Sequence, residues 1–277
     1  MTTPFIKVET TDRPDVSRLH VDQPICVGPT GNSFMFGGVG LGAAITAAQR
    51  ATDRNVVWAN AQFVSYARIG DTLDLSVEVL SGGHKTSQVR VLGTTGGKPV
   101  LSVSAALGDR ASQAVEQWLA LPADMARPDD CEPWYLWPIQ DVSATLMNRL
   151  EARMTPGLYG AGPPTGARSA DGRSVFWVRN RDGAPVDAAM LAVFGDFVPS
   201  GIGFAMGRRG GGNSLDNTLR VVSVVPTEWV LCDVRISALA RGFAHGSIYM
   251  FAEDGTLLAT GSQSVIARFV HSEIAYS

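Results

Sequence analysis

The chain has 277 residues, of which 45% are hydrophobic and 18% are charged, and its formal net charge is -3. A chain of this length and composition can bury a core, and its near-balanced charge argues against a disordered chain, a polybasic nucleic-acid binder and an acidic interaction segment. We therefore expect a small molecule or a protein as its partner, and no nucleic acid.

The three cysteines, Cys26, Cys131 and Cys232, lie far apart without a CxxC pair. This spacing predicts neither a zinc site nor a disulfide framework. The four histidines have no metal-ligand spacing either. The N-terminal stretch lacks a basic segment followed by an apolar one, and no uninterrupted apolar run reaches about 18 residues. We expect a soluble cytoplasmic protein that does not associate with membranes and has no metal.

The first third of the chain is predicted to form a helix followed by a meander of antiparallel strands. Residues 39–51 are rich in glycine and alanine, which makes a thin helix that a sheet can approach closely. Residues 72–79 alternate between apolar and polar side chains, as in a half-buried strand, and strands are also predicted at 87–92 and 100–107. Gly96 and Gly97 predict the turn between the last two strands, with positive φ.

The same plan recurs after residue 172, at a constant shift of 158 residues. The shift pairs Phe36-Gly37 with Phe194-Gly195, Gly97 with Gly255, and the strand around Val91 with that around Tyr249. A period this long indicates two domain-sized copies rather than a solenoid repeat. We divide the chain into a first unit (1–108), a linker (109–172) and a second unit (173–277). Because incomplete units can cover each other's open edges, we expect one continuous sheet face with both helices on the same side, and a cleft between the units lined by residues 34–42 and 196–203.

The linker interrupts the repeated pattern with Pro122, Pro128, Pro133 and Pro138 and with an aromatic cluster at residues 134–137. Residues 111–121 are its one predicted helix. A connection of about sixty residues is too long for a simple loop in a compact domain. We expect it to cross from one unit to the other with its tryptophans docked on the surface.

Several motifs, in a specific order, give the chain a family resemblance. They are FGGV at 36–39, ARIGD at 67–71, FGDFVP at 194–199, RGFAHG at 241–246 and DGTLLA at 254–259. In this order they resemble the type II acyl-CoA thioesterases, from about residue 34 to 268. The resemblance implies an α+β double hotdog, with two antiparallel curved sheets each wrapped around a central helix. It also implies a hydrolase of lipid metabolism that acts on an acyl-CoA without a cofactor, and we expect a homo-oligomer.

Comparison of the two copies at the fixed shift isolates a candidate site without reference to any family. Asp196 corresponds to Gly38, Ser214 to Val56, and Gln263 to Ala105. The second copy is thus polar where the first is inert. One carboxylate, one hydroxyl and one amide suit the task of holding and activating a water molecule.

The resemblance assigns roles to these residues. It implies that Asp196 is the general base, while Ser214 and Gln263 orient the nucleophilic water. Backbone N–H groups at a helix N-terminus would receive the thioester oxygen, and Gly38 and Val39 are the expected donors. The segment Asp216-Asn217-Thr218 stands where the family has Asp-His-Ser.

Each candidate also has a plainer interpretation. Asp196 could be only a helix N-cap, Ser214 could serve only a glycine-rich turn, and Gln263 could face solvent. Arg208 and Arg209 could bind coenzyme A phosphates or lie in a solvated loop.

Two other functions remain open on the same fold. One is an acyl-CoA hydratase or dehydratase, which would need a base near the acyl carbons, usually from an Asp and His pair. The other is a non-catalytic acyl-CoA-binding protein. The GxGxxA spacing at Gly38 lacks the strand and the acidic residue of a dinucleotide site, and the sequence has no GxSxG motif of a serine hydrolase.

Overall fold

The computed structural model describes residues 3–29, 31–112, 114–121, 125–134, 145–154 and 168–269. Within them, one sheet of 14 strands has the order β1-β2-β6-β7-β8-β5-β13-β16-β15-β14-β11-β10-β9, and β12 pairs with β16 beside this path. All of its pairings are antiparallel.

The elements have the following bounds. The first half contains β1 (Glu9–Thr10), β2 (Val16–His20), β3 (Cys26–Val27), β4 (Phe34–Met35), α1 (Gly37–Thr52), β5 (Val56–Phe63), β6 (Thr72–Gly82), β7 (Thr86–Thr95) and β8 (Lys98–Gly108). After it come β9 (Glu132–Trp134), β10 (Leu150–Met154), β11 (Arg173–Asn180), α2 (Ala188–Gly195), α3 (Val198–Met206), β12 (Gly210–Ser214), β13 (Asp216–Val221), β14 (Val230–Ala240), β15 (Phe243–Ala252) and β16 (Leu257–Phe269).

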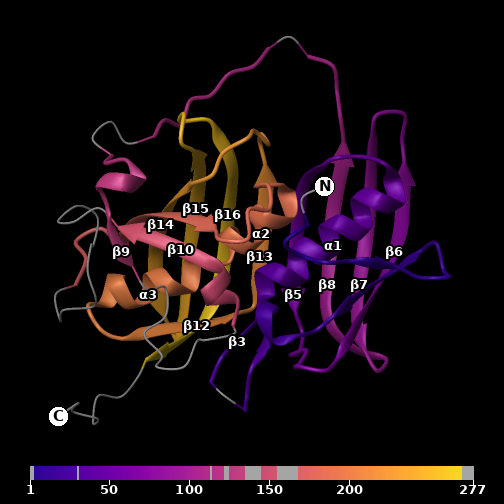
Figure 1. Cartoon of the computed structure of the whole chain (residues 1–277), viewed down its shortest axis with the longest axis horizontal. Coiled ribbons are helices and arrows are strands. Elements are labelled where there is room, and N and C mark those ends of the chain that lie inside the picture. Colours follow the sequence, from indigo (N-terminus) through magenta and orange to yellow (C-terminus); the bar gives the residue numbers. More distant parts are fainter. Residues whose placement is uncertain are drawn as a thin grey trace.

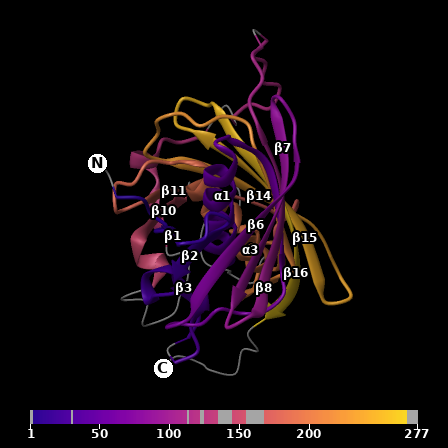
Figure 2. The same ribbon diagram turned by 90° about the vertical axis from the view of Figure 1, so that its right-hand side faces the viewer.

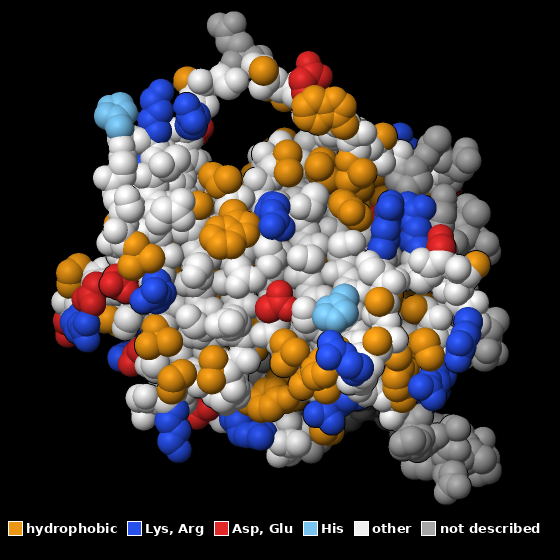
Figure 3. All heavy atoms as spheres, turned by 180° about the vertical axis from the view of Figure 1, so that it is seen from behind, with side chains coloured by type: hydrophobic (Ala, Val, Ile, Leu, Met, Phe, Trp, Pro, Cys, Tyr) orange, Lys and Arg blue, Asp and Glu red, His pale blue; other side chains and the backbone are white. Residues whose placement is uncertain are grey.

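The three helices lie on one face of the sheet, which curves around them (Figures 1 and 2). In the first half the opposite face is open to solvent (Figure 3), and outward-pointing side chains such as Val57 and Leu92 are 48% and 40% exposed. In the second half a smaller cluster that includes Trp177 and Leu231 is buried on this face, where Leu121 and Met125 pack against it. The main core lies between the helices and the concave face of the sheet.

The glycines of α1 allow the helices of the two halves to touch. A Cβ on Gly38 would lie 2.6 Å from the carbonyl oxygen of Ala192, and one on Gly42 would lie 2.7 Å from that of Ala189. Both contacts are to the backbone of α2. The small residues of α1, which predicted that a sheet could lie close to this helix, therefore also allow the backbone of α1 to lie close to that of α2.

The alternating strand is confirmed only in its first part. Leu73 and Leu75 of β6 are fully buried, but Val79 is 49% exposed, because β6 and β7 continue past the core as a hairpin. The turn at Gly96 and Gly97 is confirmed, with φ values of 55° and 78°.

The two halves join through β5 and β13, which pair antiparallel around Asn60 and Thr218. The sheets of the two halves therefore form a single continuous sheet, as predicted. Asn60 and Thr218 are themselves 158 residues apart, and the Asn60 Nδ2 group donates a hydrogen bond of 2.7 Å to the Thr218 hydroxyl. Corresponding residues meet where a two-fold relation between the halves requires them to meet.

The constant shift fails by one residue at β15. Tyr249 pairs with Thr260, whose equivalent at the shift of 158, Ser102, pairs with Leu92. Tyr249 therefore corresponds to Leu92 and not to Val91. The connection from β6 to β7 spans residues 83–85, whereas that from β14 to β15 spans only 241–242. The shorter connection and the bulge that follows Ile236 change the register of this hairpin.

The second half has two helices where one was expected. Residues 188–206 are apolar and long enough to cross a membrane by length and composition, but 67% of that stretch is buried inside the protein. It is divided at residues 196–197 into α2 and α3. Its apolar character is that of core helices.

The predicted helix at 111–121 is wrong. The described residues of this stretch have no regular structure: Val115 and Trp118 are 90% and 92% exposed, and only its end, at Leu119 and Leu121, packs against buried side chains. The Gln117 side chain instead bonds the backbone of the turn between β15 and β16, at Gly255 and Leu257.

The rest of the predicted linker adds strands to the sheet. β9 pairs with β10, and β10 pairs with β11. Trp134 docks as expected, with its ring 5.0 Å from that of Phe176 and 5.5 Å from that of Phe204. The remainder of the aromatic cluster, residues 135–137, lies outside the described residues.

Candidate functional site

Asp196 lies between α2 and α3 and is 5% exposed. It is the C-cap of α2, and Phe197 is the N-cap of α3, so the interpretation of Asp196 as the N-cap of its own helix is wrong. Its carboxylate instead reaches the other half. Oδ2 accepts a hydrogen bond of 2.7 Å from the N–H of Gly38, the second residue of α1.

Ser214 ends β12, which is a strand and not the turn that its glycines suggested. The glycines are needed because β12 lies against β16: a Cβ on Gly210 would come within 2.6 Å of the Phe269 ring. The Ser214 hydroxyl donates a hydrogen bond of 3.3 Å to Oδ1 of Asp196.

Gln263 points inward from β16 and is 3% exposed, so the solvent-facing alternative is wrong. Its Nε2 group donates to Oδ1 of Asp196 and, at 3.2 Å, to the Ser214 hydroxyl. The structure thus brings together the three residues that the comparison of the two copies singled out.

Burial raises the pKa of Asp196 to about 6, although the hydrogen bonds from Gln263, Gly38 and Ser214 oppose the shift. Removal from water disfavours the charged carboxylate, and the three donors favour it. A carboxyl group with a pKa near 6 can accept a proton at neutral pH and return it, as a general base must.

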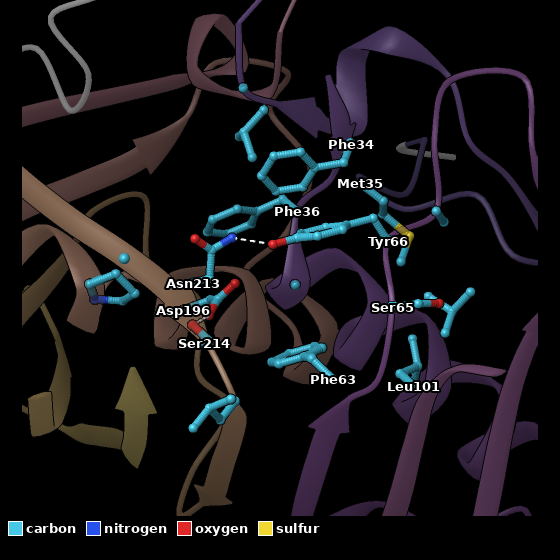
Figure 4. A pocket seen from close by; sticks show the side chains of 18 of the residues that line it. Phe34, Met35, Phe36, Phe63, Ser65, Tyr66, Leu101, Asp196, Asn213 and Ser214 are labelled. Carbon is cyan, nitrogen blue, oxygen red and sulfur yellow. Dashed lines mark hydrogen bonds between the residues drawn. The ribbon is translucent and has the colours of Figure 1, made fainter. Parts of the chain in front are cut away.

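Asp196 lines a cavity of about 320 Å³ between the two halves. Figure 4 shows residues of the first half on one side of it and Asp196, Asn213 and Ser214 on the other. Its lining is mostly apolar and aromatic, and includes Phe34, Met35, Phe36, Phe63, Leu101, Met147, Phe197 and Ile266. Such a surface suits an acyl chain better than a polar ligand.

The cavity partly matches the cleft that the sequence predicts at residues 34–42 and 196–203. Residues 34–37, 196–197 and 199–200 line it. Residues 63–67 and 212–213 also line it, and they were not predicted. These two segments meet across the cavity, where Asn213 donates a hydrogen bond to the Tyr66 hydroxyl (Figure 4).

The predicted donors to the thioester oxygen, Gly38 and Val39, are already engaged. The Gly38 N–H bonds Asp196, and the Val39 N–H donates to the carbonyl oxygen of Phe36 at 3.0 Å. The neighbouring Gly37 lines the cavity, and its N–H has no acceptor among the described residues. The first N–H of the helix is thus the available donor, one position before the predicted pair.

Arg208 and Arg209 follow α3 and are not among the described residues that line the cavity. The guanidinium of Arg208 lies 3.8 Å from the centre of the Phe269 ring. Arg268, which the sequence analysis did not single out, donates a hydrogen bond of 2.6 Å to Oδ1 of Asn213, on the cavity lining.

No group of three or more His, Cys, Asp or Glu side chains in the described part of the chain is placed to hold a metal ion. Asn217, which stands where the family has histidine, was given no role from the sequence, although it is fully buried and corresponds at the same shift of 158 to Ala59. The alignment of the two halves that pairs Gln263 with Ala105 also pairs Asn217 with Ala59, a second polar residue opposite an alanine.

Two family models match the chain. Residues 27–108 match the acyl-CoA thioesterase N-terminal domain, and residues 122–267 match the acyl-CoA thioesterase C-terminal domain. A comparison with curated proteins found no match.

Solved structures resemble the chain over nearly its whole length. A protein of Novosphingobium aromaticivorans DSM 12444, provisionally assigned as a thioesterase, is 37% identical with a TM-score of 0.85, and the match covers 94% of this chain and 97% of that one. The acyl-CoA thioesterase II of Mycobacterium marinum is 21% identical, with a TM-score of 0.73 and coverages of 96% and 97%. A hotdog-fold protein of Alicyclobacillus acidocaldarius is 17% identical, with a TM-score of 0.80 and the same coverages. The last two similarities establish a hotdog fold.

Proposed function

The chain belongs to the acyl-CoA thioesterase family, and we propose that it is a double hotdog enzyme that hydrolyses an acyl-CoA to a free acid and coenzyme A. In this proposal a water molecule activated by Asp196 attacks the thioester directly. The observation that carries it is the buried carboxylate of Asp196 on an apolar cavity, held by Gly38, Ser214 and Gln263.

The reaction needs one base that can also return a proton. Asp196 takes a proton from the water molecule while the oxygen of that water forms a bond to the carbonyl carbon of the thioester. The C–S bond of the resulting tetrahedral intermediate then breaks, and the departing thiolate receives a proton from the Asp196 carboxyl group. A pKa of about 6 supports both steps, because the carboxylate form predominates at neutral pH and the acid form remains accessible.

Negative charge develops on the carbonyl oxygen in the intermediate. We assign its stabilisation to the N–H of Gly37, at the N-terminus of α1, where the helix dipole favours negative charge. The next N–H, that of Gly38, donates to Asp196, so adjacent residues of α1 hold the proposed base and supply the proposed oxyanion donor.

Ser214 and Gln263 have different positions with respect to the reaction. Ser214 lines the cavity and is proposed to orient the water. Gln263 is not among the described residues of the lining, and its amide bonds Asp196 and Ser214 from behind. We propose that Gln263 orients the water indirectly, by positioning these two side chains.

Arginines outside the cavity are proposed to bind the coenzyme A phosphates. Arg208 and Arg209 remain candidates from the sequence. Arg268 joins them, because it is bonded to a residue of the cavity lining.

The hydratase alternative is not favoured. It would need a histidine beside the acidic base, and none is found among the described residues that line the cavity. The binding-only alternative keeps the cavity but predicts no turnover.

Release of free coenzyme A from a panel of acyl-CoAs of increasing chain length tests the proposal. We expect release that depends on chain length, because the cavity of about 320 Å³ limits the acyl group. Hydration of an enoyl-CoA without release of coenzyme A would establish the hydratase alternative. Binding of every acyl-CoA without product would establish the binding protein.

A further inference from the structure

Polar atoms without partners are concentrated behind Asp196. In the described part of the chain, five buried side-chain nitrogen and oxygen atoms have no hydrogen-bond partner, and three of them belong to two residues: Nδ2 and Oδ1 of Asn217 and Oε1 of Gln263. Asn217 is 0% exposed and Gln263 is 3% exposed. A buried amide atom without a hydrogen-bond partner is costly, so we expect a partner that bonds both the Asn217 amide and Oε1 of Gln263.

Asn217 and Gln263 are cross-strand neighbours. β13 and β16 pair Leu219 with Gly261 and Thr218 with Ser262, and the same register extended by one residue brings Asn217 opposite Gln263. The equivalent strands of the first half pair Ala59 with Ala105, the residues at the same positions in that copy. Side chains directly opposite each other on one face have Cβ atoms about 5 Å apart, a separation that one water molecule can bridge.

The two halves differ at both positions together. Ala59 and Ala105 are buried in the half that lacks the carboxylate, and they show that a small apolar pair packs well under a helix of this fold. The amide pair occurs only under Asp196. Packing alone therefore does not require Asn217.

The orientation of the Gln263 amide matters for Asp196. With Nε2 toward Asp196, the amide donates to Oδ1 and favours the carboxylate. The reversed amide would place Oε1 against the carboxylate, oxygen against oxygen, and would favour the protonated acid. A donor on the other side of Gln263, directed at Oε1, would select the first orientation.

We propose that Asn217 is a positioning residue of the site, which donates through a bridging water to Oε1 of Gln263 and so directs Nε2 of Gln263 at Asp196. Its effect on turnover rests on the proposed function, whereas its effect on the protonation of Asp196 does not.

The uncharged neighbours of Asp196 make this effect measurable. The groups that bond Asp196 are the backbone of Gly38 and the side chains of Ser214 and Gln263. The titratable and charged residues on the packed elements α1, β12, β13, β15, β16 and α3 form no hydrogen bond or ion pair with Asp196; they are Arg50, Asp216, Arg220, His245, Tyr249 and Arg268.

The test measures the pKa of Asp196 by carbon-13 NMR of the side-chain carboxyl group, in the whole chain and in Asn217→Ala. Alanine is chosen because Ala59 occupies the equivalent position. We expect the Asp196 pKa to rise by about one unit, since the carboxylate loses an oriented donor. With an acyl-CoA that the wild type hydrolyses, we expect kcat to fall about 10-fold and KM to stay within about two-fold, because Asn217 lies behind the cavity.

Ser174→Ala is the matched control, because it removes another buried, unpartnered side-chain oxygen away from Asp196. It should leave the Asp196 pKa and kcat unchanged. If Asn217→Ala does not fold, Asn217→Leu removes the amide at similar volume and is expected to give the same shift. An unchanged Asp196 pKa in a folded variant would overturn the proposal. If the wild type hydrolyses no acyl-CoA, the proposed function fails, and the NMR measurement still decides the role of Asn217.

Discussion

The N–H of Gly38 donates a hydrogen bond of 2.7 Å to Oδ2 of Asp196, the residue that corresponds to Gly38 in the second half. One copy supplies the carboxylate, and the other supplies the helix N-terminus that holds it. The site is therefore built by the contact between the halves. The difference at this one position, glycine in one half and aspartate in the other, provides both the buried carboxylate and the contact that holds it.

Gly38→Ala tests this contact. The new Cβ would lie 2.6 Å from the carbonyl oxygen of Ala192 and 2.9 Å from the Cβ of Asp196, so the helices must separate. We expect a loss of roughly 1–3 kcal/mol in unfolding free energy together with lower activity. Thermal and denaturant unfolding measure the first effect.

Gly82→Ala is the control for Gly38→Ala, because no atom lies within 4 Å of the Cβ position at Gly82. It should change stability little. Equal stability of the two variants would contradict the close contact of α1 with α2.

The hydroxyl of Ser214 is expected to be required for hydrolysis, whereas a methyl group added beside it is expected to be tolerated. Ser214→Thr should retain hydrolysis, whereas Ser214→Ala should lower kcat by about 10-fold through the loss of one oriented hydrogen bond. Steady-state kinetics with both variants provide the measurement. Full activity of the alanine variant would remove Ser214 from the site.

The pH dependence follows from the raised pKa of Asp196. Because the base must be ionised, kcat should rise as the pH increases through about 6 and then level off. Stability should change in the opposite direction. The folded protein binds the Asp196 proton more tightly than the unfolded chain does. The resulting contribution to the free energy of unfolding is fully present below about pH 4 and is lost as the pH rises through about 6.

A shift of about two pKa units corresponds to about 3 kcal/mol over this pH range. Comparison of the unfolding free energies of the wild type and Asp196→Asn between pH 4 and 7 isolates the contribution. A constant difference between the two proteins would contradict the raised pKa.

The arginines are tested with a thioester that lacks the nucleotide. Replacement of Arg208, Arg209 and Arg268 by alanine, one at a time, should raise KM for an acyl-CoA if the side chain binds a phosphate. KM for the matching N-acetylcysteamine thioester, which has no phosphate, should stay the same. A residue whose replacement changes neither value has no role in binding coenzyme A.

Local patterns predicted the parts of the fold that local physics decides. The small-residue helix, the turn at Gly96 and Gly97, and the buried alternation at Leu73 and Leu75 follow from periodicity and backbone freedom. The division of residues 188–206 into two helices does not, because nothing in an apolar stretch marks where the chain bends around a neighbouring helix.

The site was predictable as a set of differences between the copies but not as a geometry. The shift of 158 identified Asp196, Ser214 and Gln263, and it would have identified Asn217 had every position been compared. The engagement of the Gly38 N–H could not be predicted, because its acceptor, Asp196, lies in the other half. A contact of this kind leaves no periodic signal in either segment.

The most direct test of the account is the rate of coenzyme A release by Asp196→Asn, with Asp187→Asn as its matched control. Asp187 caps α2 through a hydrogen bond of 2.8 Å from the N–H of Met190, and asparagine caps a helix about as well as aspartate. The control should therefore keep full activity. Asparagine at 196 can still accept from Gly38 if the Gln263 amide reverses, so the variant should fold and bind acyl-CoA. It cannot take a proton from water, and we predict a fall in kcat of about 10²-fold to 10⁴-fold. Hydrolysis by Asp196→Asn at the wild-type rate would contradict the account, because the reaction would then proceed without its base.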